Sequence, residues 1–312
     1  MNYFFLFIII LVSFLISYKI NLKINNFDEP GESKIHKKKI LTSGGLVPFF
    51  ILTFIIAYLI YSKNENFSLY YYSIPQIWLA PISIFILIFV SFFDDLNFIP
   101  FQLRLFIQLS IVFLCISLIP VNYNYTFQTP IFNGNIPIKL DIFITILFWA
   151  FIINSTNFID GYDGMFSFQI ISNFLGLSII FYFLNENFHF LVSLMMFFIG
   201  VIFLPFNLGK KFKMFIGDTG TIPAGFILGW MIISLINMGY FFSAVILNIF
   251  FITDVILTLL NRLINKRSIF IRHNDFLFKK MIIKYGTKNY FIFGILIQIT
   301  LILLSLYLFS IK

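Results

Sequence analysis

The chain has 312 residues, of which 60% are hydrophobic, 21% are aromatic and only 11% are charged. Soluble proteins are about 45–50% apolar and about 25% charged, so this composition excludes an ordinary soluble enzyme and predicts a polytopic membrane protein. The formal net charge of +8 does not call for a nucleic-acid partner, because basic residues in a membrane protein mostly report its topology.

Ten apolar stretches approach the roughly 17–25 residues that a membrane-spanning helix needs. They are residues 3–20, 46–61, 76–93, 103–119, 141–153, 166–184, 190–206, 221–238, 242–262 and 290–309. The first lacks a basic region before it and a small-residue cleavage site, so we expect a retained anchor and not a signal peptide. The predicted fold is all-α, a bundle of about ten transmembrane helices forming a single domain over residues 1–312.

Positive charge alternates between the loops that join these stretches. One set of loops holds nearly all of the Lys and Arg residues, and the other holds only Lys63, Lys139 and the terminal Lys312. The positive-inside rule places the basic loops in the cytoplasm and both termini outside. The acidic motifs below then all fall on the cytoplasmic face. The lone Cys115 lies in an apolar run, so neither a disulfide framework nor a cysteine metal site is expected.

A cluster of polar residues lies between the fifth and sixth apolar stretches. Asn154 and Asn157 come first, and Asp160 and Asp163 follow with glycines beside them. Polar groups at membrane depth are costly and usually mark a functional site. The two carboxylates share a face if the segment is helical, and the glycines allow a phosphate to approach backbone N–H groups. Simpler interpretations are a turn that caps the next helix and hydrogen bonds between helices.

Further carboxylates end the third stretch and precede the eighth. Adjacent carboxylates such as Asp94 and Asp95 imply a cation or a proton between them, although a solvated helix end is the simpler interpretation. In Phe215-Ile-Gly-Asp218-Thr-Gly, a helix N-terminus would favour an anion while Asp218 holds Mg²⁺. Phe215 is a candidate for stacking on a nucleobase, but most of the 47 Phe residues have no such role.

Two basic segments complete the predicted site. His36 lies in Lys34-Ile-His36-Lys, ahead of Gly44-Gly45, and Arg272-His273 lies in the last cytoplasmic loop. Runs of charge in such loops mainly report topology, but Arg and His also bind diphosphates. Five cytoplasmic carboxylates together with basic loops predict Mg²⁺-dependent handling of a phosphorylated substrate at the membrane surface.

In this order and on this topology, the motifs resemble those of the polyprenyl-phosphate N-acetylhexosamine-1-phosphate transferases, or glycosyltransferase family 4. This superfamily includes the WecA-type initiators of surface polysaccharides and the related MraY enzymes of peptidoglycan synthesis. The resemblance runs from roughly residue 28 to residue 280. The segment 157–165 resembles the signature NxxDGxDGL, 215–220 resembles FMGDxGS, and 34–38 with Gly44-Gly45 resembles KIHKKPxPRxGG. Asp94-Asp95, followed by Arg104 and Gln108, resembles the family's DD motif and the RL…Q pattern after it.

The resemblance implies a role for each matched residue. Asp94 or Asp95 would deprotonate or position a lipid phosphate, and Asp163 and Phe215 would contact the nucleotide. The implied catalytic residues are Asp94, Asp95, Asp160 and Asp163; the ligands of Mg²⁺, or of Mn²⁺ as an alternative, are Asp218 and Asp160; and the substrate-binding residues are His36, Asn154, Asn157, Phe215, Arg272 and His273.

The chain also departs from the family pattern. Lys39, Leu41 and Thr42 replace family prolines and an arginine, and Asn207 lacks the Pro-Ala that follows it in the family. The second histidine of a His-x-x-His motif is absent after His273. The run of histidines typical of MraY is also missing, so we predict that peptidoglycan is not the product.

The implied activity is transfer of an N-acetylhexosamine-type sugar-1-phosphate from a UDP-sugar to undecaprenyl (polyprenyl) phosphate, with release of UMP. It would initiate a lipid-linked cell-envelope polysaccharide, such as lipopolysaccharide O-antigen, at the bacterial inner membrane. The implied partners are the polyprenyl lipid, the UDP-N-acetylhexosamine, the bilayer and a second copy of the chain in a homodimer.

Three alternatives remain beside this prediction. The first is a non-catalytic relative that binds lipid or nucleotide sugar. The second is an ion-coupled transporter, which would place acidic residues near mid-span instead of at span ends. The third is a CDP-alcohol phosphatidyltransferase, whose DGxxAR core needs Ala-Arg where this chain has Gly164-Met165.

Overall fold

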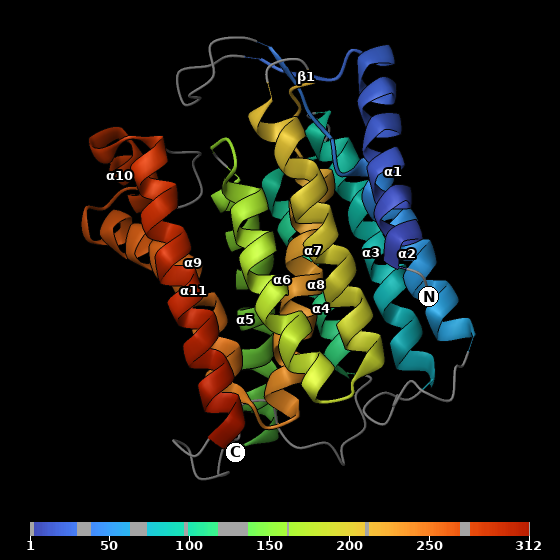
Figure 1. Ribbon diagram of the computed structural model, residues 1–312, viewed down its shortest axis with the longest axis vertical. Coiled ribbons are helices and arrows are strands. Elements are labelled where there is room, and N and C mark those ends of the chain that lie inside the picture. Colours follow the sequence, from blue (N-terminus) through green and yellow to red (C-terminus); the bar gives the residue numbers. More distant parts are fainter. Residues whose placement is uncertain are drawn as a thin grey trace.

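The computed structural model describes residues 3–29, 39–62, 74–96, 99–117, 137–160, 162–209, 212–268 and 275–311. Within these ranges the chain folds into eleven helices and one small sheet (Figure 1). The helices are α1 (Tyr3–Lys23), α2 (Leu46–Tyr61), α3 (Ile74–Asp95), α4 (Phe101–Ser117), α5 (Ile138–Ile159), α6 (Met165–Phe183), α7 (Asn187–Leu208), α8 (Asp218–Asn237), α9 (Phe241–Ile264), α10 (Leu277–Tyr285) and α11 (Thr287–Ile311). The sheet pairs β1 (Phe27–Asp28) antiparallel with β2 (Ile40–Leu41).

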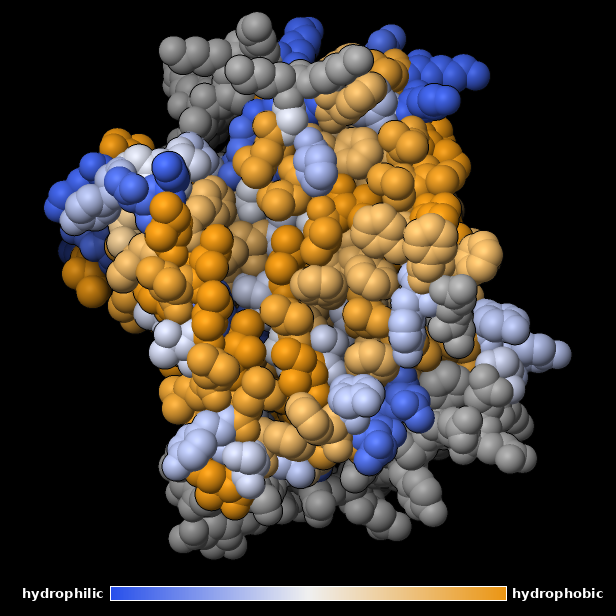
Figure 2. Space-filling view, in the orientation of Figure 1, coloured by the Kyte–Doolittle hydropathy of each residue, from blue (hydrophilic) through white to orange (hydrophobic). Residues whose placement is uncertain are grey.

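The prediction of an all-α polytopic membrane protein is confirmed. Eight of the described helices are long and apolar enough to cross a membrane, and α2 and α4 are shorter apolar helices. Large apolar side chains lie exposed on their outer surfaces, where a bilayer would cover them. Figure 2 shows apolar residues over the middle of one face, with hydrophilic residues toward the end that carries β1 and α10 in Figure 1 and a further group near the opposite end.

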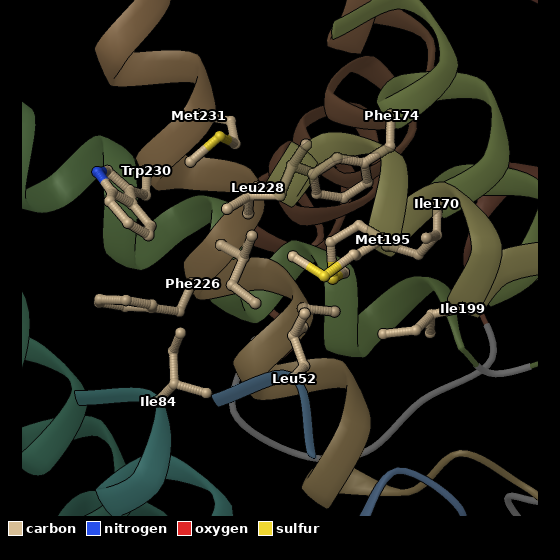
Figure 3. Packing of buried hydrophobic residues seen from close by; sticks show 14 of the residues in the cluster. Leu52, Ile84, Ile170, Phe174, Met195, Ile199, Phe226, Leu228, Trp230 and Met231 are labelled. Atoms are coloured by element: carbon tan, nitrogen blue, oxygen red, sulfur yellow. The ribbon is translucent and has the colours of Figure 1, made fainter. Parts of the chain in front are cut away.

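Helix α8 forms the centre of the bundle. All of its apolar span is buried inside the protein, against 22% for α11 at the periphery, because α8 is apolar on every side. It packs most extensively against α5 and α3. Figure 3 shows Phe226, Leu228 and Met231 of α8 among apolar side chains from neighbouring helices. The central packing of α8 fixes the position of its first residue, Asp218.

Close backbone contact joins α8 to α5. A Cβ atom on Gly225 would lie 2.7 Å from the Cα atom of Ile153, so only glycine fits at this crossing. One turn away, the indole N–H of Trp149 donates to the carbonyl oxygen of Phe226 (2.9 Å), and the two rings stack with centroids 4.9 Å apart. These contacts hold the C-terminal half of α5, which carries the Asn154 motif, against α8.

Three elements differ from the sequence prediction. Helix α5 continues past the predicted end at residue 153, so Asn154 and Asn157 lie within the helix. Asn154 donates to the carbonyl oxygen of Ala150 (2.8 Å), so its side chain bonds to the helix instead of ending it. Helix α10 and the β1–β2 pair form in segments predicted as basic loops. The carboxylate of Asp254 on α9 accepts a hydrogen bond from the N–H of Phe278 (2.7 Å), a tertiary contact that anchors the start of α10.

Candidate active site

A single arginine joins the ends of two helices at the site. The guanidinium Nη1 of Arg104, on α4, contacts both the carboxylate of Asp94 at the end of α3 and that of Asp218 at the start of α8. The three side chains are 17%, 14% and 23% exposed, so water screens this charge cluster only partly. Arg104 also lies over the ring of Phe101, with its Cζ atom 5.6 Å from the ring centroid. One positive charge therefore sits between two carboxylates at the end of an apolar bundle.

Asn157 fixes the second oxygen of Asp218. Its Nδ2 donates to Asp218 Oδ1 (2.6 Å) and to Thr221 Oγ1 (2.8 Å), which links α5 to the first turn of α8. One turn earlier, Asn154 Nδ2 donates to Gln108 Oε1 on α4 (2.9 Å). Both asparagines make hydrogen bonds between helices, while their predicted substrate-binding roles stay predictions.

The two adjacent carboxylates of α3 have different surroundings. Asp95 accepts hydrogen bonds from the N–H groups of Asp218 (2.9 Å) and Thr219 (3.3 Å), so it caps the N-terminus of α8. A third hydrogen bond comes from the hydroxyl of Ser43 (2.6 Å). Gly217 permits this approach, because its φ is +71° and a Cβ atom there would lie 2.6 Å from Asp95 Oδ2. Asp94 is directed to Arg104, and Asp95 to the backbone of α8.

The loop between α5 and α6 is held by the last turn of α7 and by the connection between α7 and α8. Asp163 forms an ion pair with Lys213, and the N–H of Gly164 donates to the buried side-chain oxygen of Asn207. Asn207 therefore retains a structural role even though the residues after it depart from the family pattern. Asp160 is partly buried at the end of α5.

Phe215 belongs to the short extended segment before α8. Its N–H donates to the carbonyl oxygen of Leu41 (2.7 Å), and its own carbonyl oxygen accepts from Gly44 (3.0 Å). The Gly44-Gly45 segment thus runs beside the Phe215–Asp218 motif, although more than 160 residues separate them along the chain. The Phe215 side chain is partly buried.

The structure brings together Asp94, Asp95, Asn157 and Asp218 through direct or shared hydrogen bonds. Asp163 joins the connection that leads into α8 through Lys213. The predicted substrate-binding residues His36, Arg272 and His273 lie outside the described residues.

Several contributing residues were not assigned a role from the sequence. Arg104 was noted only as part of a family pattern. Thr221 could have been predicted to lie at the site, because it is three residues after Asp218 and shares its helix face. Lys213 was one of many lysines in a basic loop. Ser43 had no signal of its own, because only folding brings it to Asp95.

The carboxylates around Arg104 fit a divalent cation. Among the described residues no group of three or more His, Cys, Asp or Glu side chains is suited to hold a metal. Mg²⁺, however, is usually held by one or two carboxylates together with water and substrate phosphates. Asp94 and Asp218, which already share one cationic nitrogen, form such a pair. The predicted pairing of Asp160 with Asp218 stays a prediction.

Comparison with known proteins relates the sequence that carries this site to one family. The sequence profile of Glycosyl transferase family 4 matches residues 77–236, just over half of the chain, and this region contains Asp94, Arg104, Asn157 and Asp218.

Two curated relatives match smaller parts of the chain. A phospho-N-acetylmuramoyl-pentapeptide-transferase of Staphylococcus saprophyticus is 30% identical over 152 residues, covering 46% of this chain and 47% of the relative. The protein of the same name from Staphylococcus aureus (strain JH9) is 31% identical over 122 residues, or 38% of each chain. The chain therefore spans about half the length, or less, of these relatives.

Proposed function

Because the chain belongs to glycosyl transferase family 4, we propose that it is a membrane enzyme that transfers a sugar-1-phosphate from a UDP-sugar to polyprenyl phosphate and releases UMP. The proposed donor is a UDP-N-acetylhexosamine, and the proposed acceptor is undecaprenyl phosphate of a bacterial inner membrane. The product would initiate a lipid-linked cell-envelope polysaccharide, such as O-antigen. The observation that carries the proposal is the sharing of Arg104 by Asp94 and Asp218 at the ends of two apolar helices.

Phosphoryl transfer mainly requires positioning of the two phosphates and neutralisation of their charge. Arg104 supplies a planar set of N–H donors that suits the diphosphate of a nucleotide sugar. Asp94 is the proposed group that accepts the proton of the lipid phosphate or orients it, because the oxygens of Asp95 are already bonded to α8 and Ser43. Asp163 and Phe215 are the proposed nucleotide contacts.

Mg²⁺ is the proposed cofactor, held by Asp218 together with Asp94 or Asp160. When bound, it would neutralise charge on the diphosphate and on the departing UMP. Asn157 contributes by holding one oxygen of Asp218, which sets the direction of the other.

The test is UMP release by the purified protein in nanodiscs with undecaprenyl phosphate, Mg²⁺ and a panel of UDP-N-acetylhexosamines. We expect UMP with one donor only, dependent on both lipid and metal. Asp94→Asn and Asp218→Asn should reduce turnover by at least about a hundredfold. Asp141→Asn, in the first turn of α5 and outside the site, is the matched control and should stay active. A folded wild-type protein that releases no UMP with any donor would contradict the proposal and favour a non-catalytic relative.

A second candidate donor is the UDP form of N-acetylmuramoyl-pentapeptide. The names of the two staphylococcal relatives favour it, whereas the missing histidine run argues against it. This compound belongs in the same panel. UMP release with it alone would replace the N-acetylhexosamine donor and would make the predicted exclusion of peptidoglycan synthesis wrong.

A further inference from the structure

Ser43 has an unfavourable backbone conformation beside the candidate site. It is completely buried between β2 and α2, and its φ is +57°, in the left-handed region that residues with a side chain rarely adopt. Such a conformation persists only where the surrounding structure determines it strongly, and it often occurs at functional sites.

Three buried polar residues from the α1–β1 segment hold Ser43. Its carbonyl oxygen accepts from Asn21 Nδ2 (3.0 Å) and from Ser17 Oγ (3.3 Å). Its hydroxyl oxygen accepts from Asn26 Nδ2 (2.8 Å). Because the Asn26 amide nitrogen can only donate, the hydroxyl proton of Ser43 is available for Asp95 Oδ2, 2.6 Å away. The hydrogen bonds therefore run in one direction, from Asn26 through Ser43 to Asp95.

Asp95 connects Ser43 to the site through hydrogen bonds. Its two oxygens accept the N–H groups of Asp218 and Thr219, so the position of Asp95 sets the first turn of α8. We infer that Ser43 is a positioning residue for the transfer reaction. Through Asp95 it holds the start of α8 so that the Asp218 carboxylate shares Arg104 with Asp94. This inference rests on the proposed function.

Two substitutions distinguish the effect of the Ser43 hydroxyl from the effect of the Ser43 backbone conformation. Ser43→Gly removes the hydroxyl and is compatible with positive φ, whereas Ser43→Ala removes the hydroxyl but keeps a Cβ atom. We expect kcat to fall on the order of tenfold in both variants, with the KM for the UDP-sugar within about twofold of wild type. Ser178→Ala, which removes a serine hydroxyl bonded within α6, is the matched control and should leave kcat unchanged. Wild-type kcat in Ser43→Gly would overturn the inference.

Two measurements test whether Ser43 acts through Asp95. In a double-mutant cycle, Ser43→Gly should add little to the loss caused by Asp95→Ala, because each substitution removes the hydrogen bond between Ser43 and Asp95. Full additivity would overturn the inference. Amide hydrogen exchange at residues 218–221 should be faster in Ser43→Gly than in wild type, and unchanged exchange would also overturn it. This second measurement needs no turnover, so it distinguishes failure of the inference from failure of the proposed function.

Discussion

At the scale of single residues, the site depends on how a few charges are shared. Asp94 and Asp218 would repel each other without the guanidinium of Arg104 between them. Asn157 donates to the other carboxylate oxygen of Asp218, and Asp95 accepts from the backbone N–H of Asp218. Each of these contacts joins residues from different helices, so the charge cluster also links α3, α4, α5 and α8.

Replacing Arg104 should impair turnover more than folding. In Arg104→Gln the two carboxylates lose their shared cation, and we expect kcat to fall on the order of a hundredfold. Because a divalent cation can neutralise the same carboxylates, raised Mg²⁺ should restore part of the activity. The measurement is UMP release across a Mg²⁺ titration, with thermal unfolding as the control for folding. An equal loss at every Mg²⁺ concentration would contradict the shared-cation interpretation.

At the scale of elements, the site is built where helices end. Helix α3 ends at Asp95, α8 begins at Asp218, and the Asp163 loop joins α5 to α6. Helix ends expose unpaired backbone groups, and Asp95 uses this by capping α8. The tight packing of α5 on α8 keeps Asn157 in register with Asp218 and Thr221.

The crossing of α5 and α8 offers a test of this packing. In Gly225→Ala the added methyl group would meet the backbone of Ile153, so we expect unfolding to become easier by about 1–3 kcal/mol. Activity should also fall, because separation of the helices moves Asn157 from Asp218. Thermal unfolding in detergent measures the first effect and UMP release the second. Ala57→Val, on the partly exposed side of α2, is the control. A variant as stable as wild type would contradict this prediction, because it would show that α5 and α8 can move apart without loss of stability.

At the scale of the whole molecule, the polar site lies where helices end, and apolar side chains cover the middle of the face that Figure 2 shows. The C-terminus lies at the opposite end from β1 and α10 (Figure 1). The positive-inside rule predicts that the end with β1 and α10 faces the cytoplasm.

Cysteine labelling tests this orientation directly. Cys115 is the single cysteine, so Cys115→Ser provides a background without thiols. In that background, Lys280→Cys on α10 should react with a membrane-impermeant thiol reagent only in inside-out vesicles. Tyr61→Cys, at the end of α2 far from the site, should react only in right-side-out vesicles or intact cells. The opposite pattern would invert the topology and would place the site outside the cytoplasm.

Hydropathy and motif spacing were sufficient to predict the membrane setting, the ten apolar helices and the placement of acidic motifs at helix ends. These properties follow from local hydropathy and from spacing along the chain, which need no tertiary information. The resemblance to the family could also be recognised from the sequence, because the family motifs are short and contiguous. Local pattern did not predict the extension of α5, helix α10 or the β1–β2 pair, since each makes tertiary hydrogen bonds. Asn157 of α5 donates to Asp218, the N–H of Phe278 in α10 donates to Asp254, and the carbonyl oxygen of Leu41 in β2 accepts from Phe215.

Only the tertiary structure distinguished the two adjacent carboxylates. Asp94 faces Arg104, whereas Asp95 caps α8 and accepts from Ser43, a residue 52 positions away. Likewise, Arg104 and Asp218 meet across 114 positions, and Asn157 and Asp218 across 61. Such contacts depend on how each helix is rotated about its axis and on which helix ends pack together. That information arises only when the whole bundle has formed, because it is a property of packing and not of any one segment.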